Sequence, residues 1–168
     1  MPQPTSAPPE QEHATDTDAL AEELGDVLSR RGARVAVAES LTGGLLVQAL
    51  AKVQGSGEWL AGSIVAYASD VKHDLLGVTA DKVVSREAAA QMAAGARDRL
   101  GADVAVSVTG VAGPAPQDDE PPGTVWIGAD DGTSATATLF TTSGSPEDIC
   151  MQTVAAAIRH LLDRLRPG

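Results

Sequence analysis

The sequence predicts a layered α/β domain with a mixed, mostly parallel sheet of about five strands. Strand-like apolar runs alternate with segments of helical periodicity, which is the pattern of a sheet covered by helices. The pair Asp131-Gly132 lies between two strand-like runs and is a strong hairpin signal, so at least one strand pair is antiparallel. Hydrophobic residues make up 43% of the chain and aromatic residues only 2%, which suits a core of Ala, Val, Leu and Ile.

The 168 residues fit one domain preceded by a polar leader. Met1–Thr15 contain four prolines and no Lys or Arg. We therefore expect residues 1–16 to be a disordered leader and residues 17–168 to form the domain. Thr17 can cap a first helix that Gly32 ends, with two arginines in its last turn.

The middle of the chain predicts two strands and three helices. In order, the segments are strand Arg34–Ala38, helix Leu45–Val53, strand Gly62–Tyr67, helix Ala68–Leu76 and helix Ser85–Leu100. The last two helices are each followed by a glycine, which is the preferred residue at a helix C-terminus. The last helix is rich in alanine, which indicates close packing on a neighbouring layer.

The last third of the chain predicts three strands and a final helix. In order, the segments are strand Val104–Val108, strand Gly123–Ala129, strand Thr133–Thr142 and a helix from Ser145 to about Leu165. Ser145 is a good cap because Pro146 and two acids follow it. The segment Ala115–Pro122 is rich in proline and acids and predicts an exposed loop.

Charge and composition restrict the partners and the compartment. The net charge of −11 and the pI of about 4.5 argue against binding to nucleic acid or to an anionic membrane. Cys150 is the single cysteine and fits a reducing compartment. No membrane-spanning run and no signal peptide are visible, so we expect a soluble cytoplasmic protein.

The turn from Ala38 to Gly44 is the first candidate for chemistry. It joins a strand to a helix, so Ser40 is expected at the carboxyl edge of the sheet, where α/β domains bind ligands. One interpretation is a helix cap with turn-forming glycines. The other is a nucleophilic Ser40 whose neighbours Gly43 and Gly44 offer backbone N–H groups to an oxyanion.

Other strand ends can bring further polar groups to Ser40. Tyr67 closes the second strand, Lys72 lies early in the next helix, and Thr109 with Gly110 ends a third strand. A serine, a lysine and a tyrosine form a nucleophilic set, provided that burial lowers the lysine pKa so that the amine is neutral. The alternative is a solvated surface lysine and a tyrosine at the sheet edge.

The remaining candidates predict no metal and no cofactor. His73 and His160 lie on helices without ligand partners at metal spacing, so solvated or capping roles are favoured. Cys150 is interpreted as a packing residue, and the acids Asp118 to Glu120 as a solvated loop. No phosphate-binding glycine motif follows a strand.

Several motifs in one order resemble the CinA C-terminal domain family. They are Ala38-Glu39-Ser40-Leu41-Thr42-Gly43-Gly44, Gly55-Ser56-Gly57-Glu58-Trp59, Tyr67-Ala68-Ser69-Asp70-Val71-Lys72, Leu76-Gly77, Val84-Ser85, Val108-Thr109-Gly110-Val111-Ala112-Gly113-Pro114 and Gly123-Thr124-Val125-Trp126. The match runs from about Leu20 to Leu165. Larger members carry an additional N-terminal domain, so this chain resembles the stand-alone form.

The resemblance implies a three-layer α/β/α sandwich and an amidohydrolase. Members of this kind hydrolyse the carboxamide of nicotinamide mononucleotide, a small-molecule nucleotide, to nicotinate mononucleotide and ammonia. Ser40 would be the nucleophile, Lys72 its base and Tyr67 an assistant. The substrate would be bound by Thr42, Gly43, Gly44, Thr109, Gly110 and Gly113. A homo-oligomer is among the expected states.

One departure from the family pattern supports an alternative function. Members with this activity commonly carry Gly-Asp-Arg before the last helix, whereas this chain has Pro146 at the arginine position. No Lys or Arg occurs from Gly101 to Ile158. The alternative is therefore a nucleotide-binding or regulatory module with weak or no catalysis.

Overall fold

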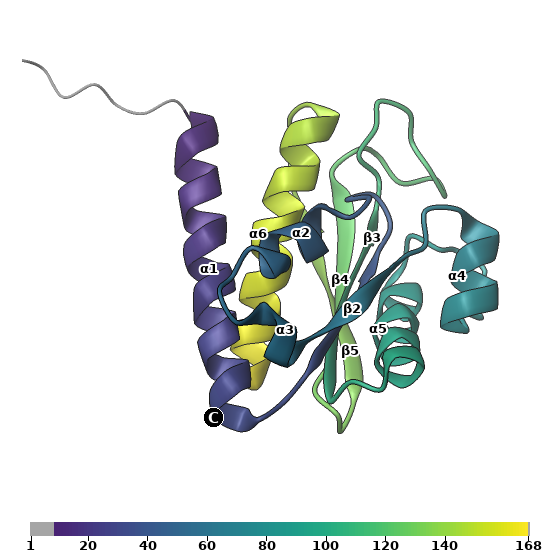
Figure 1. Cartoon of the computed structure of the whole chain (residues 1–168). Coiled ribbons are helices and arrows are strands. Elements are labelled where there is room, and N and C mark those ends of the chain that lie inside the picture. The colour runs from purple at the N-terminus through teal and green to yellow at the C-terminus, as the bar shows by residue number, and fades with distance from the viewer. Residues whose placement is uncertain (1–8, 168) are drawn as a thin grey trace, which may run out of the picture.

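The computed structural model describes residues 9–167, in which one five-stranded sheet lies between two layers of helices (Figure 1). The helices are α1 (Pro9–Arg31), α2 (Leu45–Ala51), α3 (Ser56–Trp59), α4 (Ser69–Leu76), α5 (Arg86–Leu100) and α6 (Pro146–Leu165). The strands are β1 (Val35–Glu39), β2 (Leu60–Val65), β3 (Val104–Gly110), β4 (Thr124–Asp130) and β5 (Ala135–Thr141). The expected three-layer α/β fold is confirmed.

The strand order β2-β1-β3-β4-β5 brings several chain segments to one edge of the sheet. β1 pairs in parallel with β2 and β3, whereas β3 with β4 and β4 with β5 are antiparallel. The mixed sheet is confirmed, with as many antiparallel as parallel pairs rather than a parallel majority. Because β5 runs in the same direction as β1, the start of α6 lies at the edge where β1, β2 and β3 end.

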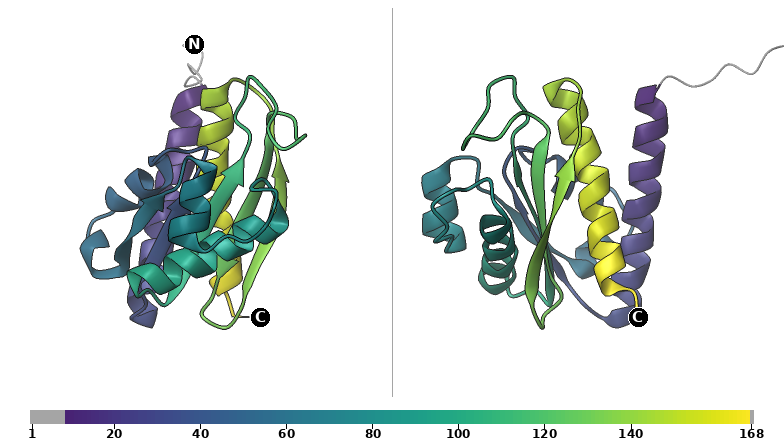
Figure 2. Two further views of the ribbon diagram at one scale, coloured as in Figure 1. Left: turned by 90° about the vertical axis from the view of Figure 1, so that its right-hand side faces the viewer. Right: turned by 180° about the vertical axis from the view of Figure 1, so that it is seen from behind.

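The two faces of the sheet carry different side chains. On β1, Val35 and Val37 belong to the apolar cluster with α1, α2 and α6, whereas Ala36 and Ala38 belong to the cluster with α5. Views from three sides show α1, α2, α3 and α6 on one face and α4 and α5 on the other (Figures 1 and 2). The small residues on this side let α5 approach the sheet closely. A Cβ on Gly128 of β4, for example, would lie 2.2 Å from the Ala89 carbonyl oxygen of α5.

The observed bounds differ from the predicted ones mainly at the N-terminus. α1 begins at Pro9, so the expected helix start at Thr17 is wrong. Proline is favourable in the first turn of a helix, and the Glu and Gln that follow it tolerate helical structure. Residues 1–8 of the expected leader lie outside the described residues, and the division into a leader and a domain stays a prediction. The short helix α3 was not predicted, because Gly55 before it and Gly57 within it indicate a break in helical structure.

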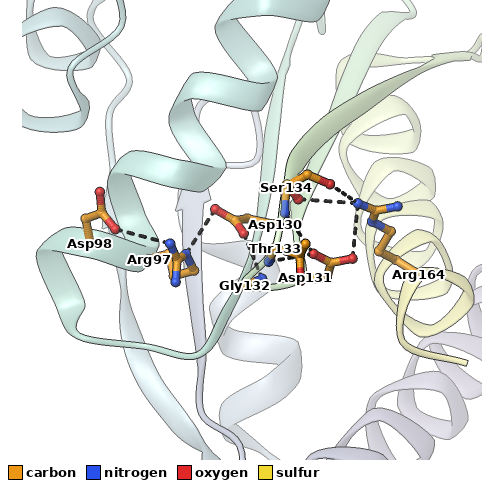
Figure 3. A network of polar contacts seen from close by, with 8 residues as sticks. All are labelled: Arg97, Asp98, Asp130, Asp131, Gly132, Thr133, Ser134 and Arg164. Carbon is orange, nitrogen blue, oxygen red and sulfur yellow. Dashed lines mark hydrogen bonds and ion pairs between the residues drawn. The ribbon is translucent and has the colours of Figure 1, made fainter.

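The predicted hairpin joins β4 to β5 at the edge opposite the strand ends described above. Asp130 is buried and pairs with Arg97 of α5 at 3.0 Å, while Asp131 pairs with Arg164 of α6 at 3.1 Å (Figure 3). Backbone N–H groups of Ser134 and Thr133 lower the Asp131 pKa. The hairpin therefore links the helical layers on both faces of the sheet.

Candidate active site

Ser40 lies directly after β1, in a turn at the edge where the parallel strands end. Its N–H donates to the Val108 carbonyl at 3.1 Å, which fixes the residue against β3. The chain then turns through Gly43 and Gly44, whose φ values of 56° and 111° favour glycine. Ser40 is 93% buried, at 7% relative exposure, and it lines a cleft of about 310 Å³ together with Tyr67, Gly110 and Gly113.

The turn is held by Glu39, a residue that the sequence did not single out. Its side chain is completely buried, and its Oε1 accepts from the Thr42 hydroxyl at 2.7 Å. Oε1 also accepts from the N–H groups of Gly44 at 3.1 Å and Leu46 at 2.9 Å, while Oε2 accepts from Val47 at 3.0 Å. The carboxylate thus occupies the first N–H groups of α2.

One signal in the sequence points to Glu39. It is the only acid in a strand whose other four residues are Val or Ala, and all five residues are buried. A buried carboxylate needs several donors. A single acid at the end of an apolar strand that precedes a helix therefore indicates a capping role across the turn.

The N–H groups of Gly43 and Gly44, which were predicted to bind an oxyanion, have partners within the protein. The N–H of Gly43 donates to the Ser40 carbonyl at 3.0 Å, and that of Gly44 donates to Glu39. Both groups expected to bind an oxyanion are therefore already occupied. Among the described residues, no hydrogen bond engages the N–H groups of Leu41 or Thr42, which directly follow Ser40.

Lys72 lies on α4 and is 1% exposed, and it is not among the residues that line the cleft. Its Nζ donates to the Tyr67 carbonyl at 3.2 Å, whereas the Tyr67 side chain is 72% exposed. Burial lowers the Lys72 pKa, and the negative charge of Asp118 opposes that shift. Within the described residues, no hydrogen bond joins Lys72 directly to Ser40.

The loop between β3 and β4 forms one wall of the cleft. Ala115, Pro116 and Gln117 line the cleft, and Gln117 exchanges two backbone hydrogen bonds with Glu120. The tip is tied down because the Asp118 carboxylate accepts from the Val84 N–H at 2.9 Å. The predicted exposed loop is thus anchored next to the site.

Both of the hydroxyl groups predicted to bind substrate, those of Thr42 and Thr109, have partners within the protein. Thr42 donates to Glu39, and Thr109 donates to the Val83 carbonyl at 2.7 Å. Both residues are buried. Gly110 and Gly113 line the cleft, and a Cβ on Gly110 would lie 2.6 Å from the Thr124 carbonyl oxygen. A Cβ on Gly113 would lie 2.9 Å from the Pro122 side chain, so both glycines are required by close packing within the protein.

A second cavity of about 440 Å³ extends the cleft to the start of α6. It shares Leu41, Tyr67, Ala112 and Gly113 with the first cavity. Its other lining residues are Leu45, Pro146, Glu147, Cys150 and Met151. In the sequence, only the family's arginine position at Pro146 pointed to this wall, because α6 begins more than 100 residues after Ser40 and the order of the strands brings it here.

Cys150 contacts the turn that carries Ser40. Its Sγ lies 3.2 Å from the Leu41 carbonyl oxygen, and burial raises the pKa of its thiol. A raised pKa keeps the thiol protonated and weakly nucleophilic at neutral pH. This agrees with the prediction of a packing residue.

The described residues contain no group of three or more His, Cys, Asp or Glu side chains that is arranged to hold a metal ion. His73 Nδ1 lies 2.6 Å from the Val78 carbonyl oxygen, beyond the end of α4. Burial lowers the pKa of His160. None of the helices from Pro9 onwards has the length and apolarity needed to cross a membrane.

The amino-acid sequence is similar to a known family over nearly all of the described chain. The model of the CinA C-terminal domain matches residues 17–165. A CinA-like protein of Frankia casuarinae is 50% identical over 107 residues, which are 61% of this chain and 25% of that protein. A CinA-like protein of Rippkaea orientalis is 44% identical over 125 residues, which are 71% of this chain and 30% of that protein. The chain spans only about a third of the length of the curated relatives it matches.

Solved structures agree with the fold. A competence-damaged protein (CinA) superfamily protein from Klebsiella pneumoniae superposes with a TM-score of 0.85 at 29% identity, covering 89% of this chain and 97% of that one. The competence/damage inducible protein CihA from Agrobacterium tumefaciens gives 0.83 at 33% identity, covering 89% and 95%. These proteins share the whole three-layer arrangement with this chain.

Proposed function

This chain belongs to the CinA C-terminal domain family, and from that premise and the geometry of the cleft we propose that it is an amidohydrolase with Ser40 as its nucleophile. One observation carries the proposal. Ser40 is buried and lines the same cleft as Tyr67, and among residues 9–167 no hydrogen bond engages its hydroxyl. The Tyr67 carbonyl holds the amine of the buried Lys72. Burial lowers the Lys72 pKa, which favours the neutral amine that a base requires.

In the first half of the reaction, the Ser40 Oγ attacks the carbonyl carbon of the amide. Its proton passes to the neutral amine of Lys72. The C–N bond then breaks, and the Lys72 ammonium returns that proton to the leaving nitrogen, which departs as ammonia. An ester between the acyl group and Ser40 remains.

In the second half, water opens this ester. Lys72 takes a proton from the water, the new oxygen bonds to the acyl carbon, and the bond to Ser40 Oγ breaks. The proton on Lys72 returns to Ser40, so that one amide and one water give one acid and one ammonia. The active serine and the neutral lysine are restored.

The free N–H groups of Leu41 and Thr42 are the donors for the oxyanion in this proposal. They take the place of the groups on Gly43 and Gly44, which have partners of their own. The N–H of the residue after a nucleophilic serine has this role at other strand-to-helix turns. Loss of one such donor commonly costs about 10²- to 10³-fold in rate.

The family resemblance supplies the substrate, which is the carboxamide of nicotinamide mononucleotide. The test is ammonia release from this compound by the wild type and by Ser40→Ala. We expect release by the wild type and a fall of at least about 10³-fold in Ser40→Ala. Ser143→Ala, which changes an exposed serine between β5 and α6, is the matched control and should retain full activity. Equal release by the wild type and Ser40→Ala would reject a serine nucleophile.

A binding or regulatory module is the second candidate, and one observation favours it. No Lys or Arg side chain lines either cavity of the cleft among the residues described, so a nucleotide phosphate meets no cation there. Tight binding of the nucleotide by calorimetry together with no ammonia release would support this candidate. Turnover that depends on Ser40 would remove it.

A further inference from the structure

The cleft carries negative rather than positive charge, although a site that binds a nucleotide phosphate usually offers a cation. Among the described residues that line its two cavities, Glu147 is the one Asp, Glu, Lys or Arg, and it lies on the first turn of α6. No Lys or Arg occurs between Gly101 and Ile158, which covers the loop wall and the α6 wall. The net charge of −11 adds a repulsive field for any anion that approaches.

The nearest cations are engaged elsewhere. Lys82 donates to the Asp118 carbonyl at 3.3 Å and pairs with Asp119 at 3.5 Å. The guanidinium carbon of Arg86 lies 5.2 Å from the centre of the Trp126 ring. Lys72 is buried and its pKa is lowered, so it is a poor partner for a phosphate.

Within residues 9–167, Lys52 lines a groove next to the cleft. That groove shares Leu45 and Met151 with the second cavity, and it contains both Lys52 and Asp18. Lys52 lies seven residues beyond Leu45, about 10 Å along α2. The carboxylate of Asp18 in the same groove offsets the attraction of Lys52 for a second anion.

The start of α6 is also occupied. Pro146 has no N–H to offer, and the Asp148 N–H donates to the Ser145 hydroxyl at 3.2 Å. The Asp148 carboxylate accepts in turn from the Ser145 N–H at 2.9 Å. This capping box, together with the carboxylates of Glu147 and Asp148, makes the start of α6 unfavourable for an anion.

We infer that the cleft selects pyridinium carboxamides that carry no phosphate over their phosphate esters. This inference rests on the proposed amidohydrolase function. A phosphate dianion near Glu147 would be repelled and would find no charge-assisted donor. A pyridinium cation would instead be attracted by Glu147 and by the exposed ring of Tyr67.

The matched substrates for the test are nicotinamide riboside and nicotinamide mononucleotide, which differ by one phosphate. We expect kcat/KM for ammonia release to be at least about tenfold higher for the riboside, equivalent to ~1.4 kcal/mol. Glu147→Gln should reduce this preference, and Glu147→Arg should reverse it. Glu58→Gln, which alters an exposed acid on α3, is the control and should leave the preference unchanged.

A binding measurement separates this inference from the proposed reaction. Calorimetry with Ser40→Ala should show tighter binding of the riboside than of the mononucleotide. If neither amide releases ammonia, the proposed reaction fails while the binding comparison still decides the charge selection. Equal or tighter binding of the mononucleotide, or binding of neither compound, would overturn the inference. If the mononucleotide is preferred and Lys52→Gln removes that preference, the inference is also wrong, because the phosphate then lies at Lys52.

Discussion

The carboxylate of Glu39 accepts a hydrogen bond of 2.7 Å from the hydroxyl of Thr42, across the turn that carries Ser40. Glu39 is fully buried, and its other donors are three backbone N–H groups at the start of α2 and, at 3.4 Å, the Ser63 hydroxyl. Several donors therefore satisfy the buried carboxylate. The position of Ser40, the proposed nucleophile, therefore depends on a residue that does not line the cleft.

Glu39→Gln should damage both stability and activity. The amide would direct an NH₂ group toward N–H donors and leave at least one of them unsatisfied in the interior. We expect the free energy of unfolding to fall by about 1–3 kcal/mol, and kcat to fall by roughly 10²-fold because Ser40 is displaced. Urea denaturation and ammonia release measure the two effects.

Thr42→Ser is the control for this prediction, because it keeps the hydroxyl that donates to Glu39 and removes only a methyl group. Its activity should remain within about twofold of wild type, whereas Thr42→Val should lose stability by about 1 kcal/mol. A fully active and fully stable Glu39→Gln protein would show that the carboxylate does not hold the turn.

The pH dependence of activity should report the protonation of Lys72. If neutral Lys72 is the base, kcat/KM rises with pH along a limb whose apparent pKa lies below 10.5. The charge of Asp118 raises the Lys72 pKa, so Asp118→Asn should lower it and shift the limb to lower pH. The asparagine amide oxygen can still accept from the Val84 N–H, which preserves the anchor of the loop.

Asp119→Asn is the matched control, since its carboxylate is 94% exposed and pairs with Lys82 rather than with Lys72. Its pH profile should overlay that of the wild type. A limb that is unchanged in Asp118→Asn, or that shifts equally in both variants, would argue against Lys72 as the titrating base.

The lowered pKa of Lys72 also predicts that the stability of the protein depends on pH. The folded-state pKa of Lys72 lies below its unfolded value of 10.5, so between the two values the unfolded chain binds more protons. The free energy of unfolding should therefore rise with pH in the window just below 10.5 through this residue. Lys72→Met lacks the titrating amine, so the difference in slope between wild type and variant isolates the effect. Identical slopes would contradict it.

The close approach of α5 to the sheet predicts a strong effect of one glycine. A Cβ on Gly128 would lie 2.2 Å from the Ala89 carbonyl oxygen and 2.3 Å from the Ser107 hydroxyl. Gly128→Ala should therefore destabilise the protein by at least about 1–3 kcal/mol. Gly57→Ala is the control, because a Cβ there meets no atom within 4 Å and should change stability by less than about 0.5 kcal/mol. Thermal unfolding distinguishes the two variants.

Much of the fold follows from local signals in the sequence. The alternation of Val and Ala in β1, the Asp131-Gly132 turn and the Ser145 cap each predict their element, because each depends on neighbours only a few residues away. The order of the strands is not local. It decides that the start of α6 faces Ser40, and no spacing in the sequence carries that information.

The candidate site could likewise be predicted only where local signals in the sequence determine it. Ser40, Tyr67 and Gly110 were predicted from strand ends and Gly113 from the family resemblance, and all four line one cleft. The partners of individual N–H and hydroxyl groups depend on the three-dimensional path of the turn. For that reason Glu39 was missed, and the donors of Gly43 and Gly44 were assigned to an oxyanion although Ser40 and Glu39 already accept from them.

The nucleophilic role of Ser40 is tested most directly by acid-quenching the enzyme during turnover of a pyridine carboxamide and measuring the intact mass. The account predicts that the wild-type protein gains the mass of the acyl group, located on the peptide that contains Ser40, and that an initial burst of ammonia equals the enzyme concentration when water opens the ester slowly. Ser40→Ala should show neither. Ammonia release by Ser40→Ala at the wild-type rate would contradict the account.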